Sequence, residues 1–204
     1  METIRGLFVI GDSISIHYGP YLREMIKDKF TYDRKRGLEH ALADLDKPVG
    51  ANAGDSSMVL EYLQEEHDLG RRYDILAISC GMHDLRRDRE SNMVQIEIDE
   101  YRRNLKSIVE ISKKMANEVI WISLTSIIDE IHNARKSGVL RYSSDVEKYN
   151  EVSTSVMKDG KVKIIDLYNF TKNLGEDIYC DHVHFKDEVR RLQGAFIAGY
   201  LNSI

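Results

Sequence analysis

Residues 7–13 read Leu-Phe-Val-Ile-Gly-Asp-Ser, a short apolar run that ends in a turn-forming triplet. The four apolar residues at 7–10 predict a strand. The triplet Gly11-Asp12-Ser13 ends this strand, and the stretch from there through Lys29 predicts a helix. A strand followed directly by a helix is the first half of a β-α-β unit.

The rest of the chain continues this alternation. Further strands are expected at residues 75–80, 119–124 and 162–167, with a weaker one at 47–53. The run at 75–80 is nearly all apolar, which is typical of a strand buried on both faces of a parallel sheet. Helices are expected at 38–45, 57–69, 98–116, 144–157 and from about 187 onward. This pattern predicts an α/β fold with a five-stranded parallel sheet, helices on both faces, and one domain spanning residues 1–204.

Composition excludes several classes of function. The 204 residues carry 29 Lys and Arg against 34 Asp and Glu, so the formal net charge is −5. This mild acidity disfavours an electrostatic grip on nucleic acid. No apolar run approaches the roughly 18 residues of a membrane span, and residues 7–10 are too few for a signal-peptide core. We therefore expect a cytoplasmic protein with no nucleic-acid or membrane partner.

Cysteine and histidine spacing gives no metal-binding motif. Cys80 and Cys180 are far apart in the chain and belong to no Cys/His cluster at zinc spacing, so two reduced thiols are expected. Asp181, His182 and His184 could together hold a metal ion, but the chain offers no obvious further cluster of ligands. Catalysis is the preferred interpretation of these residues, and no metal or cofactor is expected.

Polar residues follow the expected strands at the carboxyl edge of the sheet, where ligands bind in folds of this kind. Ser13 lies at the first strand-to-helix junction, a position that suits a nucleophile and half of an oxyanion hole, although a serine there can also be a plain helix cap. A second triplet, Gly54-Asp55-Ser56, follows the weaker strand. It either brings backbone N–H groups close to a ligand or only caps the next helix.

Two further blocks contain histidines. His83 follows the third strand in Gly81-Met82-His83-Asp84. It could donate a side-chain N–H to the same site, or it could be an ordinary surface histidine. Asp84 is expected to brace its loop by hydrogen bonds. Asp181 and His184 lie three residues apart, so a turn can bring the carboxylate against the imidazole. A carboxylate in that place orients a histidine that takes a proton from serine. His182, between them, is expected to point away.

In order and residue type the four blocks resemble the SGNH (GDSL-type) esterase and acylhydrolase superfamily, over residues 7 to about 200. Residues 10–15 match its nucleophile block, and 54–57 match the block whose glycine N–H contributes to the oxyanion hole. Residues 81–84 take the place of the family's Gly-x-Asn-Asp block, with histidine instead of asparagine. Residues 181–184 fit the Asp-x-x-His block. The third block also resembles a Gly-x-His-Asp-Leu variant of carbohydrate acetylesterase relatives.

The resemblance implies a three-layer α/β/α sandwich of flavodoxin-like type and a Ser-His-Asp esterase. Ser13 is then the nucleophile, His184 the base and Asp181 the acid that orients it. The oxyanion hole is implied to combine the backbone N–H groups of Ser13 and Gly54 with the side chain of His83. No cofactor is required.

The resemblance implies a small-molecule ester as partner, with a small acyl group such as acetyl and an acetylated carbohydrate as one possible substrate. Asp12, Arg86 and Tyr142 are the candidate substrate-binding residues, although Arg86 could also be a charged loop tip in solvent. The loop at 125–141, with Arg135, Lys136 and Arg141, is the candidate substrate-selecting wall. The alternative function is a non-catalytic phosphate- or carbohydrate-binding module on the same fold.

Overall fold

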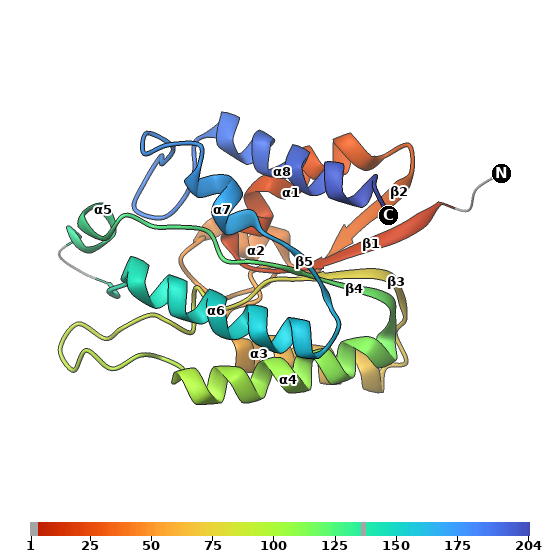
Figure 1. Cartoon of the computed structure of the whole chain (residues 1–204), viewed down its shortest axis with the longest axis horizontal. Coiled ribbons are helices and arrows are strands. Elements are labelled where there is room, and N and C mark those ends of the chain that lie inside the picture. Colours follow the sequence, from red (N-terminus) through yellow and green to blue (C-terminus); the bar gives the residue numbers. More distant parts are fainter. Residues whose placement is uncertain (1–3, 136–137) are drawn as a thin grey trace.

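One parallel sheet runs through the centre of the molecule (Figure 1). The computed structural model describes residues 4–135 and 138–204. The strands are β1 (Arg5–Ile10), β2 (Phe30–Arg34), β3 (Tyr73–Ile78), β4 (Ala116–Ile122) and β5 (Lys163–Ile165). They lie in the order β2-β1-β3-β4-β5, and every neighbouring pair is parallel. The predicted five-stranded parallel sheet is confirmed, and its strand order is that of flavodoxin-like folds.

Helices cover both faces of the sheet, which gives the three layers expected from the sequence (Figure 1). One face carries α1 (Ser13–Ile26), α7 (Leu167–Lys172) and α8 (Asp187–Leu201). The other face carries α3 (Ser56–Asp68), α4 (Ile98–Met115) and α6 (Ser143–Asp159). The short helices α2 (Leu38–Ala43) and α5 (Asp129–Asn133) lie in connections. Within residues 4–135 and 138–204, no helix combines the length and apolar character needed to cross a bilayer.

The central strands divide their side chains between two hydrophobic cores. In β3, Leu76 and Ile78 pack into the core under α3, α4 and α6, whereas Ile75 and Ala77 pack into the core under α1, α7 and α8. Because both faces of this strand are covered, neither face can be polar. This is the physical reason for the continuous apolar run that identified the strand.

Close packing of α1 against α8 fixes the two ends of the chain relative to each other. Gly194 on α8 faces the backbone of α1, and a Cβ atom added there would lie 3.0 Å from the nitrogen of Leu22 and 3.3 Å from the oxygen of Tyr18. A larger side chain would therefore push the helices apart. The contact matters because Ser13 begins α1 and the segment before α8 contains His184.

The second strand corrects the sequence prediction. It lies at Phe30–Arg34, whereas residues 47–53 form turns and touch the sheet through one isolated bridge between Gly11 and Asn52. β2 is an edge strand paired only with β1, and three of its five residues are partly or fully exposed. An edge strand of this kind needs no apolar run, so its sequence signal is weak. Pro48 and Gly50 favour turns and rule out a regular strand at 47–53.

Smaller differences concern helix ends and loops. α1 ends at Ile26 rather than Lys29, because Phe30 already pairs with β1. The expected loop at 125–141 contains α5, and the expected loop after residue 167 contains α7. Lys136, predicted to belong to the substrate wall, lies outside the described residues.

The strand order places a crevice between β1 and β3. The chain leaves β1 toward β2 on one side and later returns to form β3 on the other side, so the direction of winding reverses at this point. Ligands in such sheets bind outside the carboxyl ends of the strands at the reversal. β1 ends at Ile10 and β3 at Ile78, so the segments that follow both strands meet there.

We predict that Leu76→Ala lowers the free energy of unfolding by about 2–5 kcal/mol, because the buried side chain leaves a cavity between the sheet and its helices. Urea unfolding followed by circular dichroism measures the change. Leu69→Ala is the matched control, since Leu69 is 70% exposed and its loss should change stability by less than about 0.5 kcal/mol. Equal effects of the two substitutions would contradict the assignment of β3 to the core.

Candidate active site

Ser13 occupies the first position of α1, directly after β1. Asp12 is the N-cap of this helix, and its carboxylate accepts a hydrogen bond of 2.9 Å from the N–H of Ile14. Burial raises the pKa of Asp12, with the hydrogen bond from Ile14 opposing the shift. Asp12 was predicted to contact substrate; its carboxylate caps α1, and the residue also lines a small cavity beside Ser13. The cap holds Ser13 where the backbone N–H groups of the helix start are free of helical partners.

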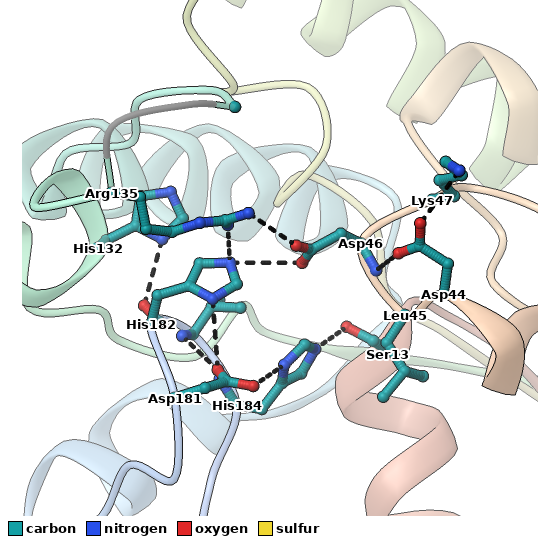
Figure 2. A network of polar contacts seen from close by, with 12 residues as sticks. Ser13, Asp44, Leu45, Asp46, Lys47, His132, Arg135, Asp181, His182 and His184 are labelled. Atoms are coloured by element: carbon teal, nitrogen blue, oxygen red, sulfur yellow. Dashed lines mark hydrogen bonds and ion pairs between the residues drawn. The ribbon is translucent and has the colours of Figure 1, made fainter.

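Ser13, His184 and Asp181 form one continuous line of hydrogen bonds (Figure 2). The Oγ of Ser13 lies 2.9 Å from Nε2 of His184, and Nδ1 of the same ring lies 2.7 Å from Oδ2 of Asp181. Ser13 and His184 are both buried. The contact between Asp181 and His184 expected from their spacing is therefore present, and the fold adds the contact to a serine 171 residues away.

Asp181 is held as a carboxylate. Burial raises its pKa, but the backbone N–H groups of Val183 and His184 and the imidazole of His184 outweigh burial, so the pKa lies below its usual range. The two backbone donors reach Oδ1 at 2.9 and 2.7 Å, which leaves Oδ2 for the imidazole. An ionised Asp181 fixes the proton of His184 on Nδ1 and leaves Nε2 free to accept the proton of Ser13.

His182 lies beside this line rather than away from it, which corrects the sequence prediction. Its Nδ1 is 3.6 Å from Oδ1 of Asp181, and its Nε2 is 3.3 Å from Oδ1 of Asp46 (Figure 2). The other oxygen of Asp46 pairs with Arg135 at 3.2 Å. Asp46 was not singled out in the sequence, because no local pattern indicates that an aspartate after α2 meets the segment before α8. Within the described ranges, no group of three or more His, Cys, Asp or Glu side chains is arranged to hold a metal ion.

A cavity of about 10 Å³ lies beside Ser13. It is lined by Asp12, Ser13, Ile14, Leu45, Asp46, Met82, His83, Arg86, Arg141 and Val183. This volume holds about one water molecule. Arg86 is thus half-buried at the cavity rather than a loop tip in solvent, whereas Tyr142 lies elsewhere, under the guanidinium of Arg87.

A larger cavity, of about 700 Å³, lies at the opposite edge of the sheet. Its lining includes Gly6 and Leu7 at the start of β1 and Tyr73 and Asp74 at the start of β3. It contains no Ser-His-Asp arrangement, and binding in parallel sheets favours the carboxyl edge. The smaller cavity, which contains Ser13, is therefore the candidate active site.

No protein-family model and no curated protein sequence matches this chain. Solved structures match it over nearly its whole length. A lipase/acylhydrolase from Enterococcus faecalis superposes with a TM-score of 0.73 at 18% identity, covering 98% of this chain and 96% of its own. A GDSL-like lipase from Bacteroides thetaiotaomicron gives 0.68 at 15% identity, covering 100% and 90%. The chain has the SGNH hydrolase fold.

An acetylxylan esterase from Geobacillus stearothermophilus shares this SGNH fold with a TM-score of 0.68 at 16% identity, covering 95% of this chain and 92% of its own. These identities are low, so the similarity concerns the backbone. The reaction that this chain can catalyse therefore depends on the arrangement of its own side chains.

His83 follows β3 in the block 81–84, and its surroundings favour the neutral form of the ring. Its Nε2 lies 3.4 Å from Nη2 of Arg86. Arginine can only donate, so Nε2 accepts and the proton of the neutral ring belongs on Nδ1. Burial, followed by the charges of Arg86 and Arg141, holds the pKa of His83 well below its usual value. Nδ1 is buried and has no hydrogen-bond partner among the described residues.

The second SGNH block works differently from what the sequence suggests. The N–H of Gly54 donates to Oδ1 of Asn52 at 3.2 Å, so this expected oxyanion donor is engaged inside its own loop. Asp55 caps α3 by accepting from the N–H groups of Ser57 and Met58. Asn52 was missed in the sequence, although an asparagine two residues before a glycine is typical of a turn in which the side chain accepts from that glycine.

Asp84 ties the second and third blocks together. Both of its carboxylate oxygens lie 3.0 Å from the N–H of Ser56, and its backbone oxygen accepts from Ile96. The interpretation of Asp84 as a brace is therefore confirmed. Burial, opposed by hydrogen bonds from Ser56, raises the pKa of Asp84 to about 7.

We predict that Asp84→Asn changes how stability depends on pH. Because the pKa of Asp84 is higher in the folded than in the unfolded chain, the folded state binds the proton more tightly between about pH 4 and 7, and wild-type stability falls as pH rises through this window. The asparagine cannot ionise, so the variant should gain up to about 1.4 kcal/mol per pH unit relative to wild type.

Urea unfolding at about pH 5 and pH 7 measures this difference. The exposed Asp28→Asn serves as control and should show no such trend. If the difference between Asp84→Asn and wild type is the same at both pH values, the proton of Asp84 is not taken up in this range.

Proposed function

We propose that this protein is a serine esterase that hydrolyses a small acyl ester through a covalent acyl-enzyme. The observation that carries the proposal is the hydrogen-bonded line from Ser13 to His184 and Asp181, with distances of 2.9 and 2.7 Å. A nucleophile, a base within hydrogen-bond reach and a carboxylate that orients the base are the parts that such catalysis requires. The SGNH-fold neighbours described as a lipase/acylhydrolase and an acetylxylan esterase support this reaction class.

Acylation begins when Oγ of Ser13 attacks the ester carbonyl and Nε2 of His184 accepts the hydroxyl proton. The new bond between Oγ and carbon forms, and the carbonyl oxygen becomes an oxyanion. When the tetrahedral intermediate collapses, the bond to the alcohol oxygen breaks and His184 returns its proton to the leaving alcohol. Asp181 keeps the ring oriented and stabilises its cationic form, as its low pKa allows.

Deacylation repeats the sequence with water. His184 takes a proton from a water molecule, whose oxygen attacks the acyl carbon. The bond to Oγ breaks, Ser13 recovers its proton from His184, and the carboxylic acid leaves.

The oxyanion is proposed to bind the N–H of Ser13 and Nδ1–H of His83. The Ser13 N–H lies at the start of α1, where no helical acceptor exists and the helix dipole is positive. His83 supplies a buried neutral donor in the cavity that contains Ser13. Gly54 can add a third donor only after its N–H leaves Asn52.

We propose an acetyl ester as substrate, with acetylated carbohydrate as the first class to test, because an acetylxylan esterase shares the SGNH fold with this chain. The alternative is a non-catalytic phosphate- or carbohydrate-binding module. Such a module does not require the hydrogen bond between Asp181 and His184. A helix N-terminus binds an anion without a base beside it.

We predict that Ser13→Ala abolishes hydrolysis of p-nitrophenyl acetate above background, because the nucleophilic oxygen is lost. The release of p-nitrophenolate measures the rate, and labelling by a fluorophosphonate probe should disappear with it. Ser155→Ala, at an exposed position of α6, is the matched control and should keep both. Turnover or labelling retained in Ser13→Ala would place the nucleophile elsewhere.

We predict that His83→Ala lowers kcat by about 10²–10³ with a modest change in KM, because one donor to the oxyanion is lost. Steady-state kinetics on the same ester measure the two constants. A variant that is folded by circular dichroism and has an unchanged kcat would remove His83 from the oxyanion hole.

A further inference from the structure

Two arginines reach the cavity beside Ser13 without a carboxylate partner among the described residues. Arg141 is 4% exposed; its Nε donates to the backbone oxygen of Met82 at 2.8 Å, and its Nη1 lies 3.3 Å from Nε2 of His132. Arg86 donates to the backbone oxygen of Asp46 at 2.6 Å, and its Nε is buried with no hydrogen-bond partner. Neither guanidinium lies within 4.0 Å of a described carboxylate oxygen.

Some other arginines of this chain are paired with carboxylates, whereas the buried Arg34 has only the uncharged oxygens of Ser15 and Ala51 as partners. Arg87 makes a two-bond contact with the carboxylate of Asp145, and Arg5 pairs with Glu118 at 2.7 Å. A cation removed from water without a counter-ion is unfavourable, since backbone oxygens replace only part of its hydration. Burial and then the neighbouring charge of Arg86 lower the pKa of Arg141 to about 9. The cavity lining thus holds two guanidiniums, and its two carboxylates, those of Asp12 and Asp46, lie beyond ion-pair distance of both.

Asp46 lines this cavity, but its carboxylate pairs with residues other than the two arginines. The two carboxylate oxygens of Asp46 face His182 and Arg135 (Figure 2). Only its backbone oxygen meets Arg86. Asp46 and Leu45 line the cavity beside Ser13 together with the two arginines. The contact of Arg86 with Asp46 is therefore one to an uncharged backbone oxygen.

We propose that the substrate is an ester carrying a carboxylate or another anionic group close to the ester carbonyl, and that Arg86 and Arg141 bind this group. The inference rests on the proposed esterase function and specifies its substrate class. Guanidinium groups present paired N–H donors that match the two oxygens of a carboxylate, so the anion supplies the contacts that the arginines lack. An acetylated hydroxy acid, including an acetylated sugar acid, has this chemistry.

Two pairs of esters test the proposal, each with one charged and one neutral member. The first pair places the charge on the alcohol side: 4-acetoxybenzoate against its methyl ester, scored by release of the phenol. The second places it on the acyl side: mono-p-nitrophenyl succinate against p-nitrophenyl pentanoate. The rate without enzyme at the assay pH is subtracted first, because the succinate carboxylate also attacks its own ester. Each value of kcat/KM is then divided by the second-order rate constant for hydrolysis by hydroxide, which corrects for the difference in intrinsic reactivity.

Wild type should favour the charged ester by about tenfold or more in at least one pair. Arg86→Gln and Arg141→Gln should each bring that ratio close to one while leaving the neutral ester less affected. Arg36→Gln is the matched control; Arg36 is exposed and pairs with Asp33, and its loss should leave the ratio unchanged. Because Arg141 is buried, Arg86→Gln keeps the test valid if Arg141→Gln does not fold.

Three results would overturn the proposal in distinguishable ways. Hydrolysis that depends on Ser13 but shows no preference for either charged ester would refute the anionic substrate and leave the esterase intact. A preference that survives in Arg86→Gln, or a fall in rate for both members of a pair alike, would make the arginines structural. Absence of any Ser13-dependent hydrolysis would refute the esterase function and the substrate class together.

Discussion

The hydrogen bond between Ser13 and His184 joins two segments that are 171 residues apart, and the architecture depends on keeping them together. Ser13 is placed by the end of β1 and by the cap from Asp12. His184 is placed by the turn around Asp181 and by α8, which packs closely on α1 because residue 194 is a glycine. Both segments belong to the same face of the sheet. A change in helix packing therefore reaches the site directly.

The electrostatics of the site depend on whether each buried charged group has a partner of opposite charge. Asp181 has donors from the backbone and from imidazole and stays ionised. Burial, followed by the charges of Arg86 and Arg141, lowers the pKa of His83 and keeps its ring neutral, so that it can donate a hydrogen bond without acting as a base. Arg141 is buried, with its guanidinium against the backbone oxygen of Met82 and the ring of His132. The same cavity thus contains Ser13 and two guanidiniums without an ion-pair partner among the described residues, and the proposal of an anionic ester rests on this combination.

Pattern reasoning was most successful where burial acts on both faces of an element. The run at 75–80 predicted β3 because helices cover both sides of it. The edge strand β2 was missed because one partner strand and a partly exposed sequence leave little periodic signal. The junction after β1 was correctly located, since a strand that ends in Gly11-Asp12 has few alternatives. The duplicate triplet at Gly54 was indistinguishable from it in sequence, yet its N–H is taken up by Asn52.

By itself, the sequence determined the parallel sheet, the position of Ser13 after the first strand and the turn that joins Asp181 to His184. Each depends on residues that are close in the chain, so spacing and apolar pattern are sufficient. Only the tertiary structure decided that His182 and Asp46 meet, that Arg86 and Arg141 share a cavity with Ser13, and that the N–H of Gly54 is occupied. Those outcomes depend on burial and on partners distant in the chain, and no local pattern encodes either.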